Sequence, residues 1–142
     1  MFWLERARPI ALLLARIGVG VIFVVHGWQK FATMGLSGTT AFFEQIDVPL
    51  PGLAAPAVAV IELVGGIALI LGAALPIAAI LLVLDMLGAI VFVHGANGFD
   101  VAKGGYEFVL ALICALLAIA FSGGGALALD DLWQRRRTAG VS

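Results

Sequence analysis

The sequence predicts an all-α integral membrane protein, a four-helix bundle built from a single domain at residues 1–142. Hydrophobic residues make up 63% of the chain and charged residues 12%, and the mean hydropathy is +1.14. A soluble domain is about 45–50% apolar and about 25% charged, so this composition excludes an ordinary soluble protein. Apolar runs of about 20 residues, the length that crosses a bilayer, occupy most of the chain.

Four predicted spans follow one another, at residues 10–31, 54–74, 76–96 and 105–121. Arg6 and Arg8 precede the first span as in a signal peptide. Its apolar core is too long for a signal peptide and no A-x-A cleavage site follows, so we expect a retained helix. Pro56 falls in the first turn of the second span, where proline favours a helix start. The glycines at 123–125 end the fourth span.

The longest connection, residues 32–53, joins the first and second spans and is rich in Gly, Thr and Pro. Within it, residues 40–46 predict a short amphipathic helix that lies on the membrane surface in the first outer loop. Residues 47–52 (DVPLPG) then predict a turn before the second span.

Positive residues set the expected orientation of the spans. Arg6 and Arg8 precede the first span and residues 135–137 (RRR) follow the fourth, whereas the first loop carries Glu44 and Asp47. Lys and Arg concentrate on the cytoplasmic side of membrane proteins. We therefore expect both termini in the cytoplasm, which requires an even number of spans.

Ionisable side chains are few within the spans, and each costs at least ~2.5–3.5 kcal/mol at the centre of a bilayer. Such residues therefore usually face the interior of a bundle. At a rise of about 1.5 Å per residue, their positions predict two layers. The deeper layer contains Arg16, Glu62 and Asp85. The outer layer contains His26, Gln29, Lys30, His94, Asn97 and Glu107.

Most of these residues have a structural interpretation beside a functional one. Arg16 can form a structural ion pair with Glu62 or Asp85, while a buried Glu62 can instead carry protons. Lys30 is either a site residue or an anchor whose ammonium reaches the membrane surface. Glu107 is either a site residue or a favourable negative charge at the start of the fourth helix.

The two histidines do not form an obvious pair with each other or with Asp85. His94 follows Asp85 by nine residues, which puts the two on opposite sides of an ideal helix unless Gly88 permits a distortion. His26 and His94 lie at different depths, and neither has a second His on its helix, so we expect neither metal nor haem. Cys114 is the only cysteine, and we expect it to be a buried structural thiol.

Several of these residues together resemble the DoxX family of small four-helix membrane proteins. Arg16 with residues 26–31 (HGWQKF) resembles that family's first helix, and residues 62–66 (ELVGG) resemble its second. Asp85 with His94, and then residues 106–107 (YE), extend the resemblance to the third and fourth helices. The resemblance implies a bacterial or archaeal plasma-membrane protein. Members include a subunit type linked to thiosulfate–quinone oxidoreduction and others associated with detoxifying redox complexes.

We therefore expect a membrane-embedded redox-associated subunit, part of a quinone-linked oxidoreductase, with a polar site between its helices. A quinone or another lipophilic electron carrier would contact His26, Gln29, Lys30, His94 and Glu107. Glu62 and Asp85 would be catalytic and handle protons. The sequence contains no redox centre of its own, so electrons would come from a soluble or membrane partner protein or from a bound cofactor.

Two other functions stay open, and nothing in the sequence favours binding to nucleic acid. The first is a transporter of a small solute or of protons, which uses the same buried charges. Because four short helices enclose little space, a homo-oligomer would then be expected. The second is a non-catalytic membrane scaffold for a redox complex, in which the ion pairs only hold the bundle together.

Overall fold

The computed structural model describes residues 1–140, which form helices and turns and contain no strand. The helices are α1 (Phe2–Ala32), α2 (Gly35–Gln45), α3 (Pro51–Leu71), α4 (Leu75–Ala89), α5 (Glu107–Ser122) and α6 (Leu129–Ala139). Short turns between α4 and α5 are η1 (Ile90–His94), η2 (Gly95–Asn97) and η3 (Val101–Lys103). Residues 141 and 142, the last two of the predicted domain, lie outside the described part.

The predicted all-helical class is confirmed. Among residues 1–140, three segments are long and apolar enough to cross a membrane: α1, α3 and the continuous segment Leu75–Asn97. The fourth predicted span corresponds to α5, which is apolar but only 16 residues long. A four-span bundle with cytoplasmic termini stays a prediction.

The bounds of α3 differ from those of the second predicted span, residues 54–74. The helix ends at Leu71 because Gly72 adopts a left-handed backbone, with φ +70°, and caps it. At the other end, Pro51 occupies the start of the helix. Pro56 therefore lies inside the helix and not in its first turn. The shift moves the whole helix about one turn toward the N-terminus of the chain.

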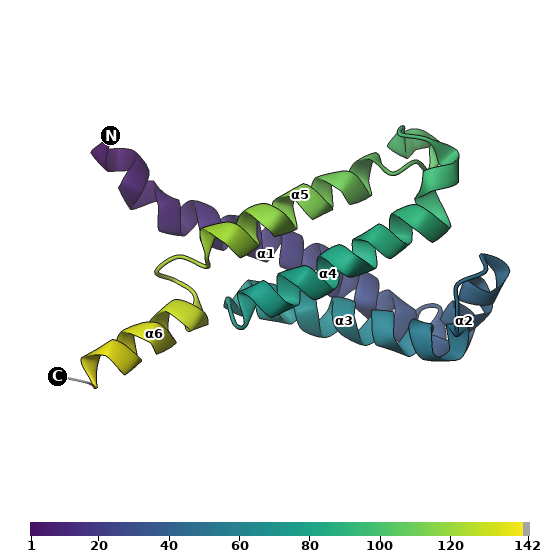
Figure 1. The fold of residues 1–142 in the computed structure, drawn as a ribbon, viewed down its shortest axis with the longest axis horizontal. Coiled ribbons are helices and arrows are strands. Elements are labelled where there is room, and N and C mark those ends of the chain that lie inside the picture. Colours follow the sequence, from purple (N-terminus) through teal and green to yellow (C-terminus); the bar gives the residue numbers. More distant parts are fainter. Residues whose placement is uncertain (141–142) are drawn as a thin grey trace.

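Helices α1 and α3 run side by side and touch through glycines (Figure 1). A Cβ added to Gly20 would lie 2.7 Å from the carbonyl oxygen of Gly66. One added to Gly27 would lie 2.5 Å from the amide nitrogen of Leu63. Small residues let helix backbones approach closely in lipid. This close contact brings the end of α1 next to the middle of α3.

The remaining helices are arranged around the α1–α3 pair. Figure 1 shows α4 and α5 beside each other, α2 at one end of the molecule, and both termini at the other end. The buried apolar core combines Phe23, Leu69, Leu82, Met86 and Leu116 with their neighbours. The predicted amphipathic helix at 40–46 corresponds to α2, which begins earlier, at Gly35, and packs against α3 and α1.

Helix α6 has no counterpart among the predicted elements, and it is fixed to the turn between α3 and α4. The Asp130 carboxylate accepts hydrogen bonds from the amides of Ala74 (2.8 Å) and Leu75 (2.9 Å), which caps α4. The Asp130 amide donates to the carbonyl of Gly72 at 3.0 Å. Asp130 therefore joins the start of α6 to the end of α3 and the start of α4.

Candidate functional site

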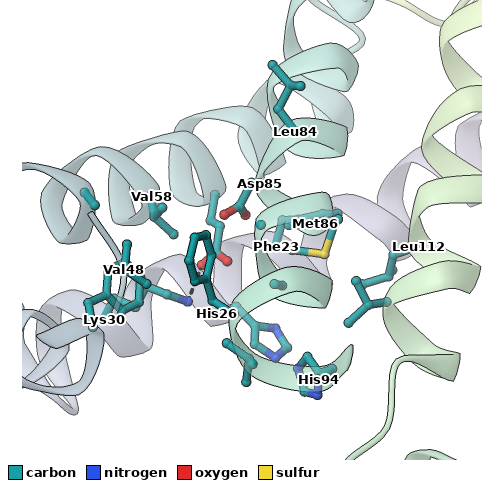
Figure 2. A pocket seen from close by; sticks show the side chains of 18 of the residues that line it. Phe23, His26, Lys30, Val48, Val58, Leu84, Asp85, Met86, His94 and Leu112 are labelled. Carbon is teal, nitrogen blue, oxygen red and sulfur yellow. Dashed lines mark hydrogen bonds and ion pairs between the residues drawn. The ribbon is translucent and has the colours of Figure 1, made fainter. Parts of the chain in front are cut away.

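A cavity of about 410 Å³ lies at the end of the molecule that α2 covers. Pockets that bind small ligands have volumes of ~300–1,000 Å³ and mostly apolar walls. The wall of this cavity is mostly apolar, with aromatic rings from Phe23, Phe42, Phe43, Phe92 and Phe108. The ionisable side chains that line it are His26, Lys30, Glu62, Asp85 and His94 (Figure 2).

An ion pair between α1 and α3 forms one side of the cavity. The Lys30 Nζ donates to Glu62 Oε2 at 2.6 Å, and the two side chains are 18% and 6% exposed. A pair this deeply buried is attracted strongly, but each ion has lost its hydration. Removing one partner leaves the other charge uncompensated, at a cost of about 3–5 kcal/mol. The cavity therefore contains charges that depend on each other.

Asp85 adds a second carboxyl group to this pair from α4. Its carboxyl interacts electrostatically with both Glu62 and Lys30, and Figure 2 shows it beside the dashed Lys30 contact. Its Oδ2 is buried and has no hydrogen-bond partner among residues 1–140. One acidic group thus pairs directly with the ammonium, a second lies near both charges, and one buried carboxyl oxygen has no hydrogen-bond partner. Buried polar atoms rarely stay unsatisfied without a functional or structural reason.

The π-helical turn η1 explains how Asp85 and His94 reach the same cavity. In an ideal α-helix the nine-residue spacing would put them on opposite sides. Residues Ile90–His94 form a π-helix, which has more residues per turn than an α-helix. This wider turn rotates His94 relative to α4. Both residues therefore line the cavity. The distortion that the sequence left open is present, shortly after Gly88.

Both histidines hold a fixed tautomer in their neutral forms. The Nδ1 atom of His26 lies 2.7 Å from the carbonyl oxygen of Ile22. The Nδ1 atom of His94 lies 2.8 Å from the carbonyl oxygen of Gly104. A carbonyl oxygen can only accept, so Nδ1 carries the hydrogen in both rings. Each neutral ring then has an unprotonated Nε2, which is a hydrogen-bond acceptor.

Three residues of the predicted outer layer lie outside this cavity. Gln29 is exposed on α1. The Asn97 Nδ2 donates to the carbonyl of Gly104 at 3.2 Å, and Glu107 Oε2 accepts from the Val101 amide at 3.1 Å. Within residues 1–140 the lining does not include these three side chains. Asn97 and Glu107 instead hold the loop that leads from α4 to α5.

Arg16 lies far from the carboxyl groups with which an ion pair was predicted. Its Nη1 donates to the carbonyls of Leu69 (3.3 Å) and Ile70 (3.2 Å), and its Nη2 to that of Leu127 (3.1 Å). Lys30, which takes Glu62 instead, follows Arg16 by 14 residues on α1, about 21 Å along the helix. The fully buried guanidinium therefore binds the end of α3, near Asp130, and not the cavity.

Two further features of the site were not anticipated from the sequence. Phe42, Phe43 and Ile46 of the α2 region form part of the cavity wall, so this segment covers the site as well as lying at the end of the molecule. The adjacent aromatic rings in an amphipathic segment were the available signal. Cys114, expected to be buried, is instead exposed on α5.

Metal ligation finds no support in the described residues. Among residues 1–140, no group of three or more His, Cys, Asp and Glu side chains is arranged to hold a metal ion. His26 and His94 line the same cavity, but each already uses Nδ1 for a backbone carbonyl. The site therefore offers hydrogen bonds and charge within an apolar chamber.

Comparison with known proteins identifies the family. The DoxX family model matches residues 11–95, which contain Lys30, Glu62, Asp85 and His94. A protein of Bacillus subtilis (strain 168) named "Putative oxidoreductase CatD" is 37% identical over 140 residues, covering 98% of this chain and 99% of that protein. "Inner membrane protein YphA" of Escherichia coli (strain K12) is 34% identical over 129 residues, covering 87% of this chain and 91% of that protein.

A third relative is a membrane protein of a mycobacterium. "Uncharacterized membrane protein Rv3486" of Mycobacterium tuberculosis is 30% identical over 146 residues, covering 96% of this chain and 89% of that protein. These relatives match nearly end to end, so the similarity includes the helices that follow the family-model match. No solved structure matches the chain.

Proposed function

This chain belongs to the DoxX family, and we propose that it is a redox-associated subunit of a prokaryotic plasma membrane that binds a lipophilic electron carrier. The ligand class that we propose is a quinone or a carrier of similar shape. The observation that carries the proposal is the cavity itself. It combines an apolar, aromatic wall with a buried Lys30–Glu62 ion pair and a nearby Asp85.

The wall fits the apolar part of such a ligand. Aromatic side chains bury large areas and stack on flat rings, and the rings that line the cavity come from α1, α2, η1 and α5. A carrier dissolved in the bilayer would reach such a chamber without crossing water.

The ionisable side chains fit the reactive part of the ligand. Reduction of a quinone takes up protons and oxidation of a quinol releases them, so the ring oxygens need partners that hold and exchange protons. Glu62 and Asp85 supply two carboxyl groups for this purpose, and Lys30 compensates for the charge that they carry. His26 and His94 provide two further sites for hydrogen bonds.

The electrons have to come from outside this chain, since its sequence contains no internal redox centre. One relative is named a putative oxidoreductase, and another is named an inner membrane protein. We infer a partner protein that delivers or removes electrons. If both termini lie in the cytoplasm, as the arginines predict, the cavity lies toward the outer side, because Figure 1 shows α2 opposite the termini.

The proposal is tested by ligand binding to purified protein in lipid nanodiscs. A decyl-substituted benzoquinone titrated onto the wild type should bind saturably, in a stoichiometric ratio. Lys30→Ala and His26→Ala should each weaken binding, whereas Gln29→Ala, on the same helix but outside the cavity, should leave it unchanged. If the wild type takes up no more of the quinone, or of its hydroquinone, than empty nanodiscs do, the proposal fails.

A further inference from the structure

The hydrogen-bonding groups of the cavity are strongly biased toward acceptors. In the neutral rings, His26 and His94 each present an unprotonated Nε2, since Nδ1 donates to a backbone carbonyl. No hydrogen bond engages either Nε2 atom within residues 1–140. Both side chains line the cavity. Each histidine can therefore accept a hydrogen bond from a ligand that binds there.

Asp85 adds a third acceptor. Its buried Oδ2 has no hydrogen-bond partner in the described part of the chain. A carboxyl group has two oxygens, so at least one of them stays an acceptor whether or not the group carries a proton. A buried acceptor without a donor destabilises the protein, and a ligand that donates to it would remove this cost.

The strong donor of the cavity is partly engaged. Lys30 Nζ lies 2.6 Å from Glu62 Oε2, and this ammonium is the only Lys or Arg side chain in the lining that residues 1–140 provide. The ammonium has two further N–H groups, and these can donate to the oxygen of a carbonyl or of a hydroxyl, so Lys30 does not distinguish the two ligand forms. A ligand that offers only carbonyl oxygens would still leave the acceptors of His26, His94 and Asp85 unsatisfied.

From this imbalance we infer that the cavity prefers the reduced, dihydroxy form of an aromatic carrier over its oxidised, dicarbonyl form. The inference rests on the proposed function and specifies its ligand. A hydroquinone has two O–H groups, and the acceptors from Asp85 on α4 and from the two histidines on α1 and η1 can receive them. The corresponding quinone has no donor. Buried polar groups left unpaired are a strong source of discrimination between otherwise similar ligands.

The test compares three ligands with the same ring and tail. Wild-type protein in nanodiscs is titrated, under anaerobic conditions, with a decyl-hydroquinone, with the corresponding decyl-quinone, and with the dimethyl ether of the hydroquinone. The ether keeps the electron-rich ring but has lost both donors. We expect the hydroquinone to bind at least about tenfold more tightly than the other two ligands. The quinone and the ether cannot donate to the cavity acceptors, so each loses at least one hydrogen bond that the hydroquinone forms.

Two variants test whether the named acceptors cause the preference. Asp85→Asn replaces one carboxyl oxygen with an amide nitrogen that can only donate, so the preference for hydroquinone should shrink toward parity. His94→Gln introduces a donor in the same way and should act in the same direction. Asp131→Asn makes the same chemical change on α6, outside the cavity, and should leave the ratio at its wild-type value.

The outcomes separate this inference from the function on which it rests. If the quinone or the ether binds as tightly as the hydroquinone, the preference is overturned and the carrier site stands. If Asp85→Asn and His94→Gln both bind the ligands but keep the wild-type ratio of hydroquinone to quinone affinity, Asp85 and His94 are not the cause of the preference. If none of the three ligands binds, the proposed function and this inference fail together.

Discussion

Lys30 and Glu62 are the residues on which the cavity depends most, because each compensates for the other's charge. We predict that Lys30→Met loses carrier binding and also destabilises the protein, since Glu62 and Asp85 then face each other without a cation. Loss of one partner of a buried pair costs about 3–5 kcal/mol. Thermal unfolding in detergent, followed by circular dichroism, measures the change in Tm.

The double variant Lys30→Met, Glu62→Gln is the control for this prediction. It removes both charges, and neutral replacement of a buried pair is often close to neutral in stability. We expect its Tm to return toward that of the wild type while its carrier binding stays weak. A double variant as unstable as the single one would contradict the view that an uncompensated Glu62 causes the loss.

Arg16 is also buried, but we expect it to contribute to stability and not to carrier binding. Its guanidinium binds three carbonyls at the end of α3 and before α6, and hydrogen bonds from charged groups contribute about 1.5–3 kcal/mol each. We predict that Arg16→Met lowers Tm by several degrees and that Arg16→Lys rescues it only in part, because one ammonium cannot match a planar guanidinium. The affinity for the carrier in the folded fraction should stay unchanged.

At the scale of single elements, the π-helical turn is the feature that assembles the site. Deleting Val91 would convert Ile90–His94 toward a regular α-helix and rotate His94 away from the cavity. We predict that this deletion weakens carrier binding to the level of His94→Ala. Val91 is exposed, so Val91→Ala is a matched control that should bind as the wild type does. Binding that survives the deletion would show that the turn is dispensable.

The elements also show how far sequence reasoning reached. The apolar runs predicted α1, α3, α4 and α5, since hydrophobic length is a strong signal for membrane helices. Their ends depended on local backbone conformations, such as the left-handed Gly72, that hydropathy does not report. Helix α6 was missed because its stability depends on Asp130, which binds a turn far away in the sequence.

The site was predictable in its residue types but not in its partners. His26, Lys30, Glu62, Asp85 and His94 were all named from the sequence, because ionisable groups stand out in apolar spans. The predicted depth of each residue in the membrane did not show that Lys30, and not Arg16, forms the ion pair with Glu62. That choice follows from the glycine contact between α1 and α3, which fixes how the two helices are aligned. Gln29 shows the same limit, because it neighbours Lys30 but is exposed.

At the scale of the whole molecule, the distribution of polar and apolar residues bears on transport. Between the carboxyl groups and the end that holds the termini, the core contains Leu69, Leu82 and Leu116, each with 0% exposure. We predict that proteoliposomes containing the wild type conduct protons no faster than protein-free liposomes, and that Glu62→Gln changes nothing. A pH-sensitive dye inside the vesicles measures this rate. Proton flux that Glu62→Gln abolishes would favour the transporter.

The most direct test of the carrier-binding site is native mass spectrometry of the protein purified from its own membrane in mild detergent. We predict that the wild type retains a quinone or quinol in stoichiometric amount. The double variant Lys30→Met, Glu62→Gln, purified in the same way, should retain only phospholipid. A wild type that carries phospholipid alone, or a double variant that carries as much of the carrier, would contradict a carrier site built around Lys30 and Glu62.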